Sequence, residues 1–107
     1  MANILIVDDI PETRSLMERI LKFEPEFDVV GTAGADAFAA VGETSADVVL
    51  MDLATNGIEI TKLVKDAYPW VQVIIVSTLE GTPEEYRGAM RAGASDFVTK
   101  DNFLRQL

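Results

Sequence analysis

The chain has 107 residues, of which 9 are Lys or Arg and 18 are Asp or Glu, so its formal net charge at pH 7 is −9. This length fits one domain, and an acidic chain without a basic run argues against direct binding to DNA or RNA. The absence of His and Cys from the sequence excludes Ser-His-Asp and Cys-His catalysis and disulfide bonds, and argues against a zinc site.

No apolar run approaches the about 20 residues that a membrane-spanning helix needs. The N-terminal segment Met1–Ile4 has no basic residue ahead of its apolar run and no signal-cleavage pattern. We therefore expect a cytoplasmic location, no contact with a membrane, and a single domain over residues 1–107.

The first half of the chain alternates between strand and helix patterns. A strand is expected at Ile4–Val7, because four apolar residues follow one another there. A helix is expected over Pro11–Phe23, with apolar residues at helical spacing and a proline in the first turn. A second strand is expected at Val29–Val30, and a short helix over Ala35–Val41 that ends at Gly42.

The second half continues this alternation. Strands are expected at Val48–Met51, Val71–Val76 and Phe97–Val98, and helices over Ile58–Tyr68 and Pro83–Ala92. A last helix over Asn102–Leu107, capped by Asp101, is only about two turns long and marginal without packing. This shortness suggests that the chain is truncated there.

Strands that alternate with helices predict a doubly wound α/β fold of the flavodoxin-like kind. The expected sheet is parallel and five-stranded, in the order 2-1-3-4-5, with helices on both faces. Several strands are continuously apolar, as is typical of strands covered on both sides. In such folds ligands bind at the carboxyl ends of the strands.

Polar residues follow four of the predicted strands and should meet at this edge. They are Asp8, Asp9, Asp52, Ser77 and Lys100. Three carboxylates at one edge repel one another unless a cation lies among them, and Mg²⁺ prefers such oxygen ligands. A carboxylate there can attack phosphorus and form an aspartyl phosphate, with the lysine and the metal neutralising the phosphoryl oxygens and the serine donating to one. Taken singly, each residue also fits an inert role as a cap, turn residue, strand end or solvated lysine.

These residues stand in longer strings that match a known family. The strings Ile4–Asp9, Val48–Leu53, Val76–Thr78 and Gly93–Lys100 closely resemble the receiver domain of two-component response regulators, and the likeness covers the whole chain. The resemblance implies that Asp52 is the phosphoacceptor. It also implies a Mg²⁺ cofactor with Asp9 as the direct ligand, Asp8 as a ligand through water and the backbone carbonyl of Ala54 as a further contact, and it counts Asp52 among the metal-site residues.

The same resemblance gives Ser77 and Lys100 the task of binding the phosphoryl group. It places Phe97 at the aromatic switch position, where the ring turns inward when the hydroxyl at Ser77 moves toward the phosphate. The alternative for Phe97 is a plain core aromatic residue, because it lacks a hydroxyl that would keep it near solvent.

The implied partner is a histidine kinase or a phosphotransfer protein that donates the phosphoryl group. The signal would leave through the face formed by the helix Pro83–Ala92, the strand Phe97–Val98 and the helix Asn102–Leu107, which is also a surface for a homodimer. A C-terminal output domain would lie outside this chain. The domain would catalyse at most its own phosphorylation and dephosphorylation, and is not expected to be an enzyme toward other substrates.

Two positions depart from the family pattern. The loop after Asp52 reaches Gly57 three residues sooner than is usual in the family, and Asp101 replaces a proline that commonly follows the lysine in a cis peptide. A cis bond before a residue other than proline costs about 2.5 to 4 kcal/mol. Either the Lys100–Asp101 bond is trans and the amine approaches along a changed path, or the fold bears that strain.

Three other kinds of protein are alternatives to a phosphoacceptor. A pseudo-receiver would keep the fold but act as a phosphorylation-independent protein interaction module, and the shortened loop favours it. A phosphatase of the haloacid dehalogenase type would need Asp-x-Asp after the first strand, whereas the chain has Asp8-Asp9-Ile10. A nucleotide-binding loop is excluded, since no Gly-x-x-x-x-Gly-Lys occurs.

Overall fold

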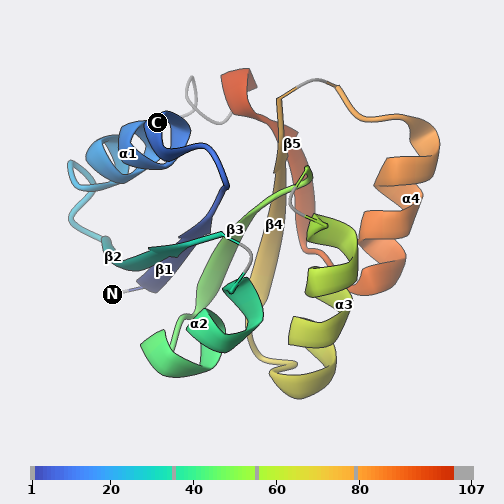
Figure 1. Cartoon of the computed structure of the whole chain (residues 1–107), viewed down its shortest axis with the longest axis horizontal. Helices are drawn as coiled ribbons and strands as arrows, with labels where there is room; N and C mark the ends of the chain where they lie inside the picture. Colours follow the sequence, from blue (N-terminus) through green and yellow to red (C-terminus); the bar gives the residue numbers. More distant parts are fainter. Residues whose placement is uncertain (1, 35, 55, 79, 103–107) are drawn as a thin grey trace.

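Parallel strands form the centre of the molecule, as the alternating pattern predicts. The computed structural model describes residues 2–34, 36–54, 56–78 and 80–102. Within them one sheet has the strand order β2-β1-β3-β4-β5, every neighbouring pair being parallel (Figure 1). The strands are β1 (Ala2–Val7), β2 (Phe27–Ala33), β3 (Val48–Asp52), β4 (Gln72–Ser77) and β5 (Asp96–Thr99). The predicted doubly wound α/β fold, with its strand order, is confirmed.

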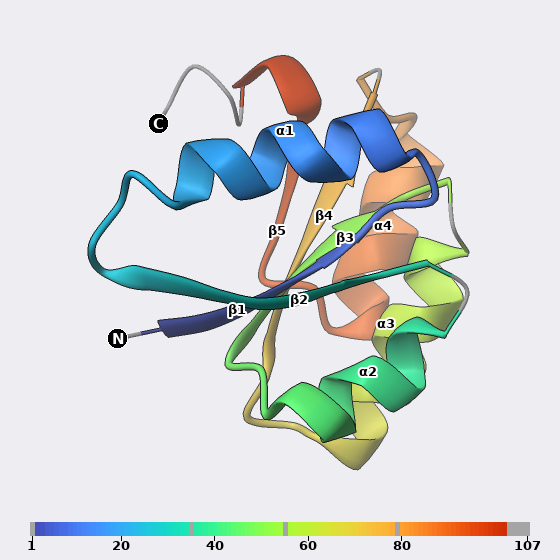
Figure 2. The same cartoon turned by 60° about the vertical axis from the view of Figure 1, so that its left-hand side comes forward.

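Helices cover both faces of this sheet. One face carries α1, and the other carries α2, α3 and α4 side by side (Figure 2). Their bounds are α1 (Pro11–Leu21), α2 (Ala37–Thr44), α3 (Gly57–Ala67) and α4 (Pro83–Ala92). None of the helices in the described ranges has the length and apolar character needed to cross a lipid bilayer.

Two apolar layers follow from the strict alternation of side chains along a strand. In β1, Leu5 and Val7 point into the layer beneath α2, α3 and α4, while Ile4 and Ile6 point into the layer beneath α1. The central strand β3 divides in the same way, since Val49 and Met51 join the first layer and Leu50 joins the second. Burial on both faces explains why these strands are continuously apolar.

The helix expected over Ala35–Val41 differs from α2 (Ala37–Thr44) at both ends, and it does not stop at Gly42. A Cβ atom at Gly42 would lie 2.5 Å from the hydroxyl oxygen of Tyr68, so the glycine allows a close approach between α2 and the end of α3. The helix ends instead at Thr44, and the capping residue that follows, Ser45, has a left-handed φ of 53°.

The chain turns into a helical conformation directly after β5, at Lys100. The expected cap at Asp101 is wrong, because Thr99 precedes the helical residues and its Oγ1 accepts a hydrogen bond from the backbone N–H of Asn102 at 3.2 Å. The described residues contain no cis peptide bond, so the Lys100–Asp101 bond is trans. The rest of the helix expected over Asn102–Leu107 lies outside the described residues.

Candidate functional site

The carboxyl ends of β1, β3 and β5 bring three charged side chains into contact. The Lys100 Nζ lies 3.0 Å from Asp8 Oδ2 and 3.7 Å from Asp52 Oδ1. The side chains of Asp8 and Asp52 are only 1% and 5% exposed, and that of Lys100 is 14% exposed. The peptide bond between Lys100 and Asp101 is trans, and Lys100 contacts both carboxylates with the backbone in this form. One ammonium group therefore bridges two buried carboxylates.

Asp8 is held in place from both of its carboxylate oxygens. Its Oδ1 accepts a hydrogen bond from the backbone N–H of Ile10 at 2.9 Å, which fixes the turn after β1. Its Oδ2 is buried and accepts no hydrogen bond of good geometry from the described residues, so the ion pair with Lys100 is its described contact. A buried carboxylate oxygen in this position has capacity for a further cation or donor.

Arg14 is a site residue that the sequence analysis did not identify. It lies in the first turns of α1, and its guanidinium donates a hydrogen bond to the backbone carbonyl of Asp8 at 3.2 Å. This contact ties α1 to the turn that carries the acidic pair. The position of Arg14 in the sequence could have indicated this contact, because a residue about one turn into α1 lies near the end of the preceding strand.

Asp9 has a different environment from Asp8. Its side chain is exposed at the rim of the site, and its Oδ1 lies 2.8 Å from where a Cβ atom at Gly34 would stand. It therefore faces the segment after β2. In the described part of the chain no three acidic side chains are gathered in a metal-binding arrangement. Asp8 and Asp52 meet at Lys100, whereas Asp9 stands apart from that contact.

Asp52 and Ser77 end the neighbouring strands β3 and β4 and are both buried. They line a cavity of about 440 Å³ together with Leu53 and Ala54. The cavity continues past Thr78 and Glu80 to Thr82 and Glu85 at the beginning of α4. The buried carboxylate of Asp52 therefore adjoins a space large enough for a small molecule or a side chain of a partner.

The segment from Asp52 to α3 is short and tightly packed. A Cβ atom at Gly57 would lie 2.5 Å from the backbone carbonyl oxygen of Asp52 and 3.1 Å from the Cγ of Met51. Asn56, just before the helix, has a left-handed φ of 53°. A side chain at position 57 would thus push against the backbone of Asp52.

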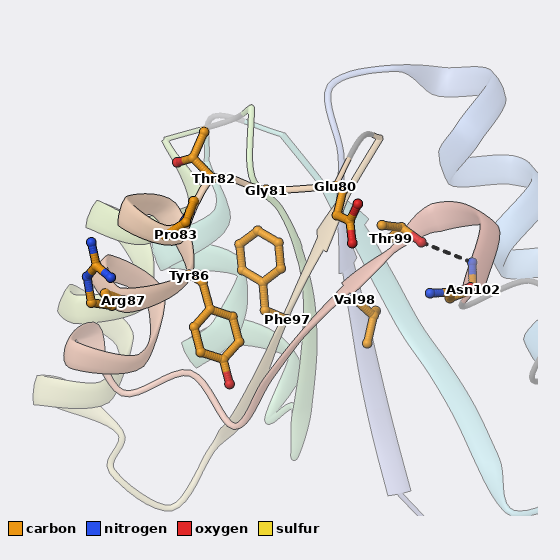
Figure 3. A pocket seen from close by; sticks show the side chains of 10 residues that line it. All are labelled: Glu80, Gly81, Thr82, Pro83, Tyr86, Arg87, Phe97, Val98, Thr99 and Asn102. Atoms are coloured by element: carbon orange, nitrogen blue, oxygen red, sulfur yellow. Dashed lines mark hydrogen bonds between the residues drawn. The ribbon is translucent and has the colours of Figure 1, made fainter.

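Phe97 lies beside α4 and not in the acidic site itself. Its ring packs on Tyr86, with ring centroids 6.0 Å apart, and lies against Gly81 (Figure 3). Both aromatic residues line a second cavity of about 410 Å³, which extends to Val98 and Thr99. Phe97 is half-buried and packs against the apolar layer under α4, so its ring has contacts to the core and to this surface cavity.

Comparison with known proteins identifies the family of this chain. The family model of the response regulator receiver domain matches residues 4–107. The chain belongs to this family of signalling domains of two-component systems, as its resemblance implied.

Among curated proteins, the chain is 35% identical to the transcriptional regulatory protein LnrK of Bacillus subtilis, over 94% of this chain and 48% of that protein. It is 33% identical to a protein-glutamate methylesterase/protein-glutamine glutaminase of Agrobacterium fabrum, over 94% of this chain and 30% of that protein. The chain thus spans half the length or less of these relatives.

Solved structures give the same assignment. A two-component response regulator of the LuxR family from Aurantimonas is 32% identical, with a TM-score of 0.86 over 99% of this chain and 81% of that one. The signal receiver domain of the response regulator NarL from Mycobacterium tuberculosis is 26% identical, with a TM-score of 0.85 over 94% of this chain and 84% of that one.

Proposed function

We propose that this chain, as one receiver domain over residues 1–107, accepts a phosphoryl group on Asp52. The observation that carries the proposal is the ammonium of Lys100 between the buried carboxylates of Asp8 and Asp52, at 3.0 and 3.7 Å. A carboxylate at the wall of a cavity, with a cation beside it, has the surroundings that a nucleophile toward phosphorus needs. In this proposal the domain catalyses at most its own phosphorylation and dephosphorylation.

In the proposed reaction a carboxylate oxygen of Asp52 attacks the phosphorus of the donor. The bond from phosphorus to the donor breaks, and the donor leaves with the bonding electron pair. Lys100 neutralises charge on the phosphoryl oxygens, and the hydroxyl of Ser77, which lines the same cavity, donates a hydrogen bond to one of them. Burial strengthens these electrostatic interactions, because few water molecules compete for the charged groups.

The donor set of the site fits Mg²⁺, which takes hard oxygen ligands. Asp8 and Asp52 carry two buried negative charges against one ammonium, and Asp8 Oδ2 accepts no hydrogen bond of good geometry from the described residues. We propose that Asp8, Asp9, Asp52 and the backbone carbonyl of Ala54 hold the ion. When bound, Mg²⁺ supplies positive charge that offsets the oxygens of the phosphoryl group.

A histidine kinase or a phosphotransfer protein is the proposed donor, and a cytoplasmic location goes with that partner. We propose that the signal leaves through α4, β5 and the helix that begins at Lys100. Ser77 and Phe97 lie on the paired strands β4 and β5, which supports the role of the ring as a switch. The cavity between Tyr86 and Phe97 gives this face a surface for a partner or a second copy of the chain. An output domain would follow in a longer protein.

A phosphorylation-independent interaction module remains the second candidate. Two observations favour it: the close approach of Gly57 to the backbone of Asp52, and the direction of Asp9, which faces Gly34. Such a module would keep the Lys100 ion pairs as part of its structure and pass on a signal through protein contacts alone.

The mass of the intact protein after incubation with a phosphoryl donor and Mg²⁺ distinguishes the two candidates. A phosphoacceptor gains one phosphoryl adduct, which is absent from the Asp52→Asn variant and from a sample with EDTA. Acetyl phosphate and a phosphorylated histidine kinase serve as separate donors, because a small molecule and a protein approach the site differently. If neither donor gives an adduct, the interaction module is the better description.

A further inference from the structure

The cavity beside Asp52 is larger than a phosphoryl group needs, and its outer part is acidic. From Asp52 and Ser77 it extends to the beginning of α4, where Thr82 and Glu85 line it, and Glu80 lines it from the preceding segment. The described lining residues include three carboxylates and no side chain with a positive charge. A donor bound for transfer to Asp52 must place its remaining atoms in this space.

Glu85 is fixed in position by the first turn of α4. The backbone N–H of Thr82 donates to Glu85 Oε1 at 2.9 Å, and the backbone N–H of Glu85 donates to Thr82 Oγ1 at 3.1 Å. This reciprocal pair is a capping box. Glu85 as a whole residue is half-buried, and the hydrogen bond that its carboxylate accepts lies at an exposed position, so its negative charge has a defined place at the rim of the cavity.

We propose that Glu80 and Glu85 select the phosphoryl donor by the charge of its leaving group. This inference rests on the proposed phosphorylation of Asp52. In an in-line displacement the leaving atom lies on the side of phosphorus opposite the attacking oxygen. The cavity that Asp52 lines extends to the beginning of α4, and we place the leaving group in that outer part. The two glutamates favour donors that release a neutral or cationic nitrogen base, and disfavour acyl phosphates, which release a carboxylate.

Two small donors separate these leaving groups while the acceptor step stays the same. With phosphoramidate protonated on its nitrogen, the Asp52 oxygen forms a bond to phosphorus, the P–N bond breaks, and neutral ammonia leaves with the electron pair and then takes a proton from water. With acetyl phosphate the same P–O bond forms, the P–O bond to the acetyl group breaks, and acetate leaves with a negative charge. Only the second reaction brings an anion toward Glu80 and Glu85.

The test compares adduct formation with the two donors in Mg²⁺, followed by intact-protein mass over time. Glu85→Gln removes the charge but keeps the capping box, because glutamine also accepts from the N–H of Thr82. Glu84→Gln is the matched control, since Glu84 lies in the same turn but is exposed and does not line the described cavity. Both variants change the net charge of −9 equally. Glu80→Gln gives a second, independent probe.

We expect Glu85→Gln to raise the rate with acetyl phosphate about threefold to tenfold over Glu84→Gln, and to leave the rate with phosphoramidate nearly unchanged. The difference should shrink as the salt concentration rises. The selection by charge is overturned if the ratio of the rate with acetyl phosphate to the rate with phosphoramidate is the same in Glu85→Gln, Glu80→Gln and Glu84→Gln. The proposed function still stands in that case, because an adduct forms. No adduct from either small donor overturns the selection by charge, and the proposed function falls as well only if a phosphorylated histidine kinase also gives no adduct.

Discussion

The ammonium group of Lys100 lies nearer to Asp8, at 3.0 Å, than to Asp52, at 3.7 Å. The lysine is thus anchored by the carboxylate at the end of β1, and it extends toward the carboxylate at the end of β3. A single cation beside two buried anions leaves an excess of negative charge, which is costly in a poorly solvated place. The stability of the domain should therefore respond very differently to removal of the cation and to removal of one anion.

Lys100→Met should lower the free energy of unfolding by about 3 kcal/mol, because it leaves two carboxylates buried without their shared cation. Asp52→Asn should change it by less than about 1 kcal/mol, since Lys100 keeps its nearer partner Asp8. Urea unfolding followed by circular dichroism measures both. Lys62→Met, at an exposed position of α3, controls for loss of a positive charge. Equal stability of Lys100→Met and Lys62→Met would contradict the prediction.

Mg²⁺ should raise the melting temperature of the protein if the acidic edge binds it as proposed. At ten times the dissociation constant the gain is about 1.4 kcal/mol, which corresponds to about 5 °C or more for a domain of this size. Asp9→Asn should abolish most of this shift. Asp28→Asn, on the exposed side of β2, should retain it. A shift that persists in full in Asp9→Asn would show that the exposed Asp9 does not turn toward the ion.

The sequence was sufficient for the fold because apolar strand patterns set the order of elements, and the parallel arrangement then places strand ends at one edge. Asp8, Asp52 and Lys100 meet for that reason. Side-chain direction in loops is set by local packing, which a strand pattern does not contain. The sequence therefore gave no indication that Asp9 faces Gly34.

A strand or helix pattern also does not show contacts to backbone atoms, or contacts between residues that lie far apart in the sequence. Arg14 donates to the backbone carbonyl of Asp8. Every residue has such a carbonyl, so the residue types alone do not predict this contact. Gly42 looked like a helix end, but it serves a contact with Tyr68, which lies far along the chain. Thr99, rather than Asp101, precedes the last described helical residues, because the chain becomes helical at Lys100, directly after β5.

Gly57→Ala should destabilise the protein by about 1 to 3 kcal/mol, because its methyl group would lie 2.5 Å from the carbonyl oxygen of Asp52. Relief of that contact requires a movement of the segment that carries Asp52, so the rate of phosphorylation should fall as well. Gly88→Ala is the control in α4, where a Cβ atom makes an ordinary contact with Ile58 at 3.5 Å. It should stabilise by about 0.5 to 1 kcal/mol. Urea unfolding gives the stabilities, and a Gly57→Ala protein as stable as wild type would refute the close approach.

The contact between Gly81 and Phe97 should appear as a coupling free energy. A Cβ atom at Gly81 would lie 2.8 Å from Phe97 Cε1, so Gly81→Ala should force the ring from its place against Tyr86 and cost about 1 to 2 kcal/mol. In a Phe97→Leu background the shorter side chain leaves room for the methyl group, and the same substitution should cost less than half as much. A double-mutant cycle measured by urea unfolding gives the coupling, expected at about 1 kcal/mol.

Gly88→Ala in the same two backgrounds is the control for this cycle, because Gly88 contacts Ile58 and not Phe97, and its effect should add independently. If Gly81→Ala lowers the free energy of unfolding equally in both backgrounds, the side chain at position 81 does not contact the ring of Phe97. A coupling of the expected size places Gly81 in the path of the proposed switch. Any inward or outward turn of the Phe97 ring must then pass Gly81, so Gly81→Ala should also shift the equilibrium between ring positions, which two-dimensional NMR of the aromatic side chains would detect as displaced Phe97 and Tyr86 resonances.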